Sequence, residues 1–175
     1  MAARNRAVLL VGHGGVPRDY PHESVTRLKR LEAQRRTTGG APTAEEVELD
    51  QRIRRWPRKP ETDPYQAGLE ALAESLRQRL TPVQLAVAYN EFCSPTIAEA
   101  VADLVAAGTD EVTVIPSMLT PGGSHSEVEI PATLAELRRL YPAITLSYAW
   151  PFDLGLIGTM LAEHLRNFHA GTSRP

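Results

Sequence analysis

Near its start the chain reads Ala7-Val8-Leu9-Leu10-Val11-Gly12-His13-Gly14-Gly15, an apolar run that ends in glycines on both sides of a histidine. A short, continuously apolar run is typical of a parallel strand that helices cover on both faces. The glycines let the backbone turn sharply and let a bulky partner come close. This stretch therefore predicts a buried first strand that carries His13 on the loop at its carboxyl end.

Three further apolar runs have the length of strands, and they lie at 83–88, 112–115 and 144–149. Patterns with helical spacing separate them. These helices are expected at 63–80, 94–107, 125–140 and from 153 onward. Alternation of strands and helices predicts an α/β fold, in which a four-stranded parallel sheet with right-handed crossovers is flanked by helices. The last strand alternates between apolar and polar residues more than the others, so we expect it at an edge of the sheet.

The stretch between the first strand and residue 63 is far longer than an ordinary strand-to-helix loop. Two helices are expected there, one over 23–36 and one from the capping box Thr43-x-x-Glu46 to about Arg55. Arginines are frequent in this stretch, and its apolar face is thin. We interpret residues 16–62 as a helical insertion beside the mouth of a site, within a single domain that spans residues 1–175.

Composition excludes several classes of function. A formal net charge of −2 gives no reason to expect nucleic acid or an anionic membrane as a partner. Cys93 is the only cysteine, so neither an intrachain disulfide nor a cysteine-based zinc site is expected. No apolar run approaches the roughly 20 residues of a membrane span, and the first one is too short for a signal peptide. A cytoplasmic protein is therefore expected.

Three side chains that can carry chemistry follow different predicted strands. His13 follows the first strand, Glu91 the second, and His125 the third, in the stretch Pro121-Gly122-Gly123-Ser124-His125. In an open α/β sheet such loops gather at the carboxyl ends of the strands, where ligands bind. Two imidazoles that face one crevice can hold a divalent metal or move protons, and a carboxylate can accept protons or complete a metal site. We therefore expect one site that contains all three residues.

Each of these residues also has a plainer interpretation. A histidine at a strand end can simply bond a nearby carbonyl group, and Glu91 can be a solvated loop residue. Glu127 and Glu129 lie where a helix dipole favours carboxylates, so capping explains them as well as catalysis does. Cys93 is interpreted as a small buried hydrophobic residue. The arginines of the insertion form a solvated face or meet an acidic substrate.

Three stretches together resemble the signatures of the class II tetrapyrrole chelatases, the group of sirohydrochlorin cobaltochelatases and ferrochelatases. The run 12–15 resembles their Gly-His-Gly-Ser motif, and Glu91 lies four residues before a proline, as it does in them. The run 116–125, followed by Glu129-Ile130-Pro131, resembles their Pro-x-x-Leu/Phe-x-x-Gly-x-His motif. The chain departs from the family at Gly15, where the family has serine, at Ser124, and in the insertion.

The resemblance implies a chelatase-like, flavodoxin-like three-layer fold. It implies insertion of a divalent metal into a sirohydrochlorin-type tetrapyrrole, with Co²⁺ or Fe²⁺ expected, Ni²⁺ a further candidate, and no organic cofactor. His13 and His125 would be the metal ligands, and Glu91 would join them in catalysis as proton acceptor. The residues that would let the flat ring lie against the backbone are Gly14, Gly15, Gly122, Gly123 and Ser124. Short, single-lobe members pair, so a homodimer is expected.

The main competing hypothesis is a chelatase-like protein that binds a tetrapyrrole or a metal as a carrier or chaperone, without catalysis. An α/β-hydrolase esterase is disfavoured, because Gly122-Gly123-Ser124-His125-Ser126 lacks the final glycine of the nucleophile motif. A histidine phosphatase would have arginine before His13, and the chain has Gly12 there.

Overall fold

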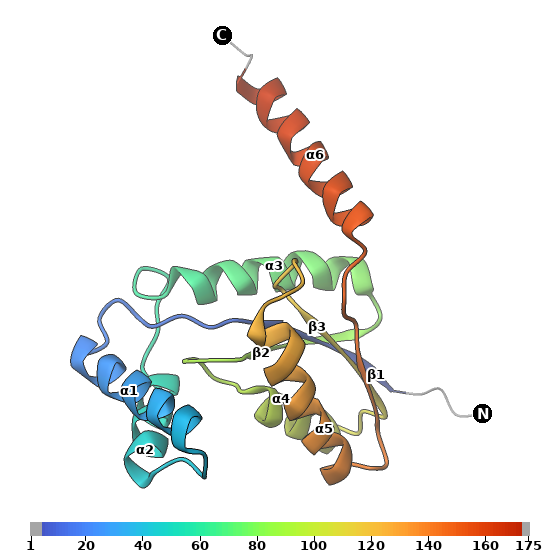
Figure 1. Ribbon diagram of the computed structural model, residues 1–175. Coiled ribbons are helices and arrows are strands. Elements are labelled where there is room, and N and C mark those ends of the chain that lie inside the picture. The colour runs from blue at the N-terminus through green and yellow to red at the C-terminus, as the bar shows by residue number, and fades with distance from the viewer. Residues whose placement is uncertain (1–4, 173–175) are drawn as a thin grey trace.

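The computed structural model describes residues 5–172, in which four parallel strands form one sheet (Figure 1). The strands are β1 (Arg6–Gly12), β2 (Gln84–Tyr89), β3 (Glu111–Pro116) and β4 (Thr145–Tyr148). Their order across the sheet is β2-β1-β3-β4, so β4 lies at an edge, as predicted. In the register of the sheet, Leu9 lies beside Ala86 of β2 and Val114 of β3.

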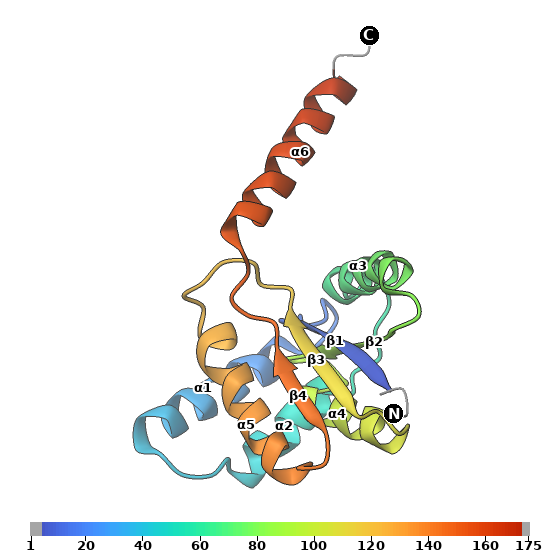
Figure 2. The same ribbon diagram turned by 90° about the vertical axis from the view of Figure 1, so that its right-hand side faces the viewer.

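Helices cover both faces of this sheet, which confirms the three-layer architecture (Figure 2). On one face α4 (Ile97–Ala106) and α5 (Ile130–Leu140) cover a core that contains Leu9 and Val11 of β1. On the other face α3 (Pro64–Leu80) packs against Leu10. The alternation of β1 side chains between two apolar layers explains why this strand is apolar along nearly its whole length.

The helix starts agree with the sequence in part. Asp63 caps α3 as expected, since its side chain accepts a hydrogen bond from the Gln66 amide at 2.9 Å. The expected start of α4 at Ser94-Pro95 is wrong, because the helix begins at Ile97 after a capping box formed by Thr96 and Glu99. That box satisfies two backbone N–H groups at once, which a Ser-Pro start cannot do.

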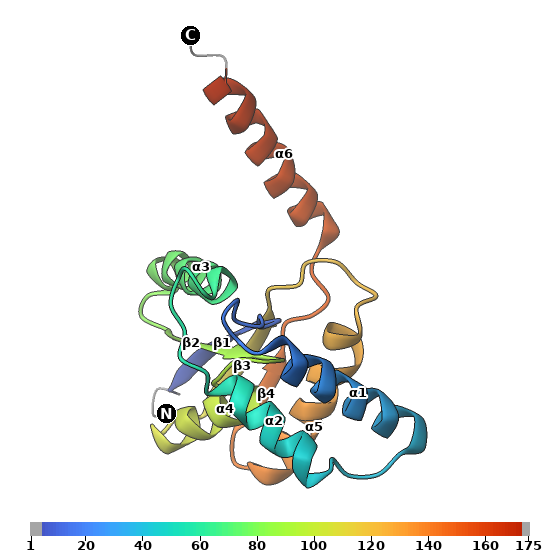
Figure 3. The ribbon, with the colours of Figure 1, turned by 90° about the vertical axis from the view of Figure 1, so that its left-hand side faces the viewer.

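The two helices expected between the first strand and residue 63 are α1 (His22–Thr38) and α2 (Ala44–Arg54), which pack on each other (Figure 3). Thr43 caps α2, but Glu46 does not complete the predicted capping box. The Glu46 carboxylate is buried and instead accepts a hydrogen bond from the Arg35 guanidinium at 2.8 Å. Leaving a buried carboxylate without a charged partner costs more free energy than leaving one helix N–H group without a side-chain cap, which accounts for the difference.

The last helix, α6 (Leu154–Thr172), leaves the body of the molecule and projects from it (Figure 1). Its leucines at 156, 161 and 165 are more than half exposed. Within residues 5–172, no helix combines the length and the apolar content needed to cross a membrane.

Candidate metal centre

The topology of the sheet brings two of the predicted loops to one place. From β1 the chain passes to β2 on one side, and β3 lies on the other side of β1. The crevice at such a switch point lies between the loops that follow the two neighbouring strands. The loop after β1 carries His13, and the loop after β3 leads to His125.

His13, Glu91 and His125 meet at this crevice, as the sequence predicted. One ligand atom from each of the three side chains lies within 4.8 Å of the other two. The rings of His13 and His125 are 4.5 Å apart between centroids and are nearly perpendicular. Nε2 of His125 is 3.5 Å from a carboxylate oxygen of Glu91. All three side chains are half-buried, so the cluster can be reached from solvent.

The orientation of His13 leaves one of its ring nitrogens free for a ligand. Its Nδ1 lies 2.7 Å from the carbonyl oxygen of Gly14, which can only accept, so the proton is on Nδ1. Nε2 then keeps its lone pair. The backbone N–H of His13 donates to the Tyr65 hydroxyl at 2.6 Å, which holds the loop from the side of α3.

His125 is oriented in the same way, by a carboxylate. Its Nδ1 lies 2.9 Å from a Glu129 oxygen and 2.8 Å from the amide nitrogen of Asn90, and its Nε2 faces Glu91. These two contacts hold Nδ1 away from the centre and leave Nε2 directed to it. The amide of Asn90 donates to the same Glu129 oxygen at 2.9 Å. Burial raises the pKa of Glu129, but the hydrogen bonds from Asn90 and His125 outweigh burial, and the pKa lies below its ordinary value. Glu129 is therefore a stable anionic partner for the imidazole.

Three residues that shape the centre were not assigned this role from the sequence: Asn90, Glu129 and Tyr65. Glu129 had a detectable signal, because it lies four residues after His125, and such pairs share one face of a helix. The two residues lie at the ends of a single π-helical turn, η1 (His125–Glu129), which leads into α5. Tyr65 belongs to α3, and no local pattern connects it with His13.

The glycines predicted to bind substrate lie in two different environments. Gly14 has a φ of +96°, and a Cβ there would lie 1.8 Å from the carbonyl oxygen of Glu91. A Cβ on Gly15 would touch Asp63 and Tyr65 at 3.3 Å. Gly122 and Gly123 have nothing within 4 Å of such an atom, and the next residue, Ser124, directly precedes His125. The first pair therefore permits close packing of loops, whereas the second pair faces open space.

Replacing Gly14 by alanine should lower the free energy of unfolding by about 2–3 kcal/mol, because the added methyl group collides with the backbone that carries Glu91. Gly108, which follows the C-cap residue of α4, is the control, since its φ of +82° is also positive and nothing lies within 4 Å of an added Cβ. Gly108→Ala should cost about 1 kcal/mol. Urea unfolding of both variants measures the difference. Equal losses in the free energy of unfolding would mean that the loops carrying Gly14 and Glu91 can move apart at no cost, which would contradict the prediction.

The helical insertion forms hydrogen bonds with the loop that carries Glu91. Arg58 lies between β1 and this loop, and its side chain is only 5% exposed. It pairs with the buried Asp63 and donates to the carbonyl oxygens of Gly15 and Phe92. Arg54 donates to the carbonyl oxygen of Cys93 at 3.0 Å. The insertion thus supports the loop after His13 and the loop around Glu91 together.

Cys93, although it lies in this loop, is a small buried side chain in the core under α3, as interpreted from the sequence. Burial raises the pKa of its thiol, which keeps the sulfur protonated and weakly nucleophilic.

The chain is similar to known proteins. It is 35% identical over 82 residues to the sirohydrochlorin cobaltochelatase of Priestia megaterium, a match that covers 44% of this chain and 26% of that enzyme. The fold resembles the sirohydrochlorin chelatase SirB from Bacillus subtilis subspecies spizizenii, solved in complex with cobalt. The TM-score is 0.51 and the identity 22%, over 84% of this chain and 43% of that one.

A second solved structure has a similar length. It is a CbiX protein from Marinobacter aquaeolei VT8, with a TM-score of 0.56 and 18% identity over 97% of this chain and 98% of that one. The chain thus spans less than half of the Priestia enzyme and of SirB, but nearly all of the Marinobacter protein. The family model of CbiX matches residues 61–163, which include Glu91 and His125, and the chain belongs to the CbiX family.

Proposed function

We propose that this protein inserts a divalent metal, cobalt or iron, into a sirohydrochlorin-type tetrapyrrole. The observation that carries the proposal is the convergence of His13, Glu91 and His125, whose ligand atoms lie within 4.8 Å of one another. Neutral imidazoles bind Co²⁺, Fe²⁺ and Ni²⁺ without the permanence of a thiolate cage, which suits a metal that must leave again. Membership of the CbiX family and the partial match to a sirohydrochlorin cobaltochelatase support this choice of reaction.

The chemistry requires both a metal holder and a base. As the metal enters the macrocycle, four pyrrole-type nitrogens bind it and two N–H protons leave. In the proposal His13 and His125 hold the metal through Nε2. Glu91 accepts one of the two protons, and water that reaches the half-buried cluster takes the other. The distance of 3.5 Å between Glu91 and Nε2 of His125 supports these roles, because a small movement brings the carboxylate to either the metal or a proton.

The experiment is anaerobic incubation of the protein with sirohydrochlorin and Co²⁺, and separately with Fe²⁺, followed by absorption spectra. Metal insertion beyond one equivalent per protein, faster than without protein, is the expected result. A spectral shift that stops at one equivalent would instead indicate a carrier of the tetrapyrrole. No response to either metal would overturn the proposal. The cytoplasmic location stays a prediction of the sequence.

We further propose that two copies of the chain form a homodimer through α6. This helix carries Leu154, Leu156, Met160, Leu161, Leu165 and Phe168, each between 47% and 69% exposed. Parallel sheets normally have both faces covered, yet α3 packs mainly on β2 (Figure 2). Toward β4 on the α3 face of the sheet, Ile115 is only half-buried and Ser147 is exposed. One chain thus has an exposed apolar helix and, toward β4, a part of a sheet face that α3 does not cover. This combination suits an exchange of α6 between two copies.

Replacing both Leu161 and Leu165 by glutamate should convert the dimer into a monomer, because the charges would be buried in the interface. Sedimentation velocity over a range of protein concentrations measures the change. Glu163→Gln, a polar substitution on the same exposed helix, is the control and should leave the dimer intact. A wild-type protein that sediments as a monomer at all concentrations would contradict the proposal.

A further inference from the structure

A hollow of about 280 Å³ lies between α1 and the loop that carries Glu91. Its wall on the α1 side includes Lys29, Glu32 and Arg36, and its other wall is Glu91 and Phe92. Because Glu91 also belongs to the metal centre, this hollow opens directly beside the place where the metal would sit. The insertion therefore forms one side of the space that a substrate at the metal centre would occupy.

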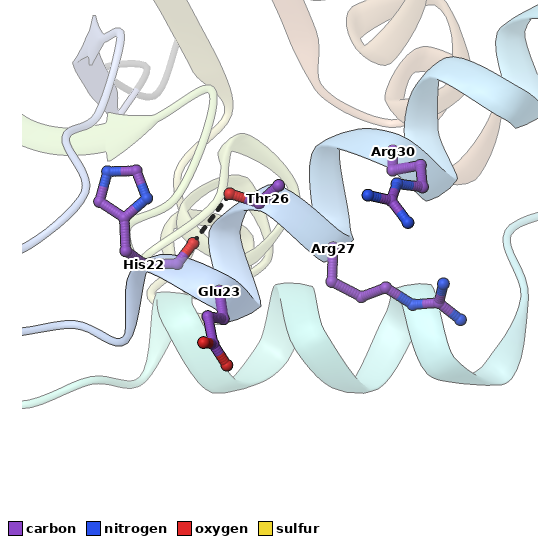
Figure 4. Close-up of a pocket in the computed structure, with 5 residues that line it drawn as sticks. All are labelled: His22, Glu23, Thr26, Arg27 and Arg30. Atoms are coloured by element: carbon purple, nitrogen blue, oxygen red, sulfur yellow. Dashed lines mark hydrogen bonds between the residues drawn. The ribbon is translucent and has the colours of Figure 1, made fainter.

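The hollow continues along α1. An adjoining hollow of about 430 Å³ shares Lys29 and is lined in part by the apolar side chains of Val16 and Val25. At the far end lies a third hollow, bordered by His22, Glu23, Thr26, Arg27 and Arg30 (Figure 4). Here the Thr26 hydroxyl donates to the carbonyl oxygen of His22 within the helix, so its proton is not available to an anionic ligand. Of the three hollows, the one lined by Lys29 and Arg36 is the one that also contains Glu91 of the metal centre.

Of the five lysines and arginines of α1, four fall into two sets, and the fifth, Arg30, borders the third hollow. Arg27 and Arg35 face α2, where their guanidinium groups pair with Glu45 at 2.7 Å and with Glu46 at 2.8 Å. Lys29 and Arg36 are exposed, and within residues 5–172 neither forms an ion pair with a carboxylate. They are seven residues apart, hence on one helical face and roughly 10 Å apart along the axis. Two cations that form no ion pair within the described residues therefore border the same hollow.

Glu32 lies between them on this face and must be considered with them. Burial and the neighbouring Glu91 carboxylate raise the pKa of Glu32, while Arg36 lowers it less. A raised pKa reduces the negative charge that Glu32 places next to the two cations. A cation–π interaction holds Lys29 in place, because its ammonium group lies 5.4 Å from the centre of the Phe92 ring.

We propose that Lys29 and Arg36 bind two side-chain carboxylates of the macrocycle, so that α1 positions the ring over the metal centre. This inference rests on the proposed function, and it assigns to the insertion the recognition of an anionic, carboxylate-bearing ring. Arginine and lysine are the side chains suited to such groups. The separation of the two cations means that each would engage a different carboxylate. They take no part in metal binding, because protonated ammonium and guanidinium groups have only donors and no lone pair to offer a metal.

Two variants, Lys29→Gln and Arg36→Gln, test the inference. Each should raise KM for sirohydrochlorin about tenfold, the loss expected for one charge-assisted hydrogen bond. The value of kcat and the affinity for Co²⁺ alone, measured by calorimetry without the macrocycle, should not change. Lys29→Arg should restore KM to near the wild-type value. A methyl-esterified macrocycle, whose carboxylates are neutral, should bind the wild type and both variants equally.

Arg77→Gln is the matched control, because it removes the same charge from an exposed position on α3. Circular dichroism and urea unfolding establish that every variant is folded. If Lys29→Gln and Arg36→Gln keep the KM of Arg77→Gln while the wild type turns over, the inference is wrong and the proposed function stands. If the wild type neither binds nor converts sirohydrochlorin, the proposed function itself has failed.

Discussion

Replacement of His125 by alanine is expected to lower the rate of cobalt insertion by about 100-fold or more, because loss of a group that merely orients a metal ligand already costs about 10- to 100-fold. His13→Ala should have an effect of similar size. Nε2 of His125 faces Glu91, and the Nδ1 atoms of His13 and His125 are engaged by the carbonyl oxygen of Gly14 and by Glu129. In either alanine variant, the metal loses the imidazole nitrogen that the proposal assigns to that residue.

The measurement is the initial rate of Co²⁺ insertion into sirohydrochlorin, together with calorimetric titration of Co²⁺. Glu129→Gln should be intermediate, with a rate about tenfold below that of the wild type, since it keeps the shape but weakens the orientation of His125. His164→Ala, on the projecting helix α6, is the control and should keep the wild-type rate. A His13→Ala or His125→Ala variant with the wild-type rate would remove that residue from the proposed set of metal ligands.

Replacement of Arg58 by methionine is expected to lower the free energy of unfolding by about 3–5 kcal/mol, the usual cost of breaking a buried ion pair by removing one partner. Asp63 is 2% exposed, so its charge would remain in the interior without a cation. The carbonyl oxygens of Gly15, Ile53 and Phe92 would also lose their donor. Urea unfolding of the metal-free protein, at a fixed protein concentration, measures the loss.

Arg52→Met is the matched control on the same insertion, because the side chains of Arg52 and Glu48 are 53% and 71% exposed. Such a surface pair contributes less than about 1 kcal/mol. A second test adds Asp63→Asn, which removes the buried charge and still caps α3. The double variant should be more stable than Arg58→Met alone. A loss of less than 1 kcal/mol for Arg58→Met would contradict the assigned role of this ion pair.

The fold was largely predictable because its determinants are local. A strand buried on both faces has to be apolar along its length, so β1 and β3 were visible as short apolar runs. Helix starts depend on nearby capping groups, and Asp63 and Thr43 were recognised in this way. The prediction for α4 was wrong because two candidate starts lie two residues apart, and the capping box at Thr96 is the better of them.

The three loops of the candidate centre were also identifiable, since the carboxyl ends of parallel strands meet at one edge of a sheet. Their supports were not, apart from the helical spacing between His125 and Glu129. Arg58 lies 34 residues before the Phe92 carbonyl that it holds, and Tyr65 lies 52 residues after the His13 amide. Contacts across such separations depend on how the elements pack, and no local pattern encodes them.

The alternation of strands and helices, most element boundaries and the identity of the three central side chains thus follow from neighbours along the chain, where apolar period, capping and glycine content act over a few residues. The orientations of the two imidazoles, the hydrogen bonds of Arg54 and Arg58 to the loop around Glu91, the order of the strands, and the pairing of Arg27 and Arg35 with α2 follow from packing alone. Each of these needs a partner from a distant element, because a hydrogen bond or an ion pair forms only where the folded backbone brings donor and acceptor within about 3 Å.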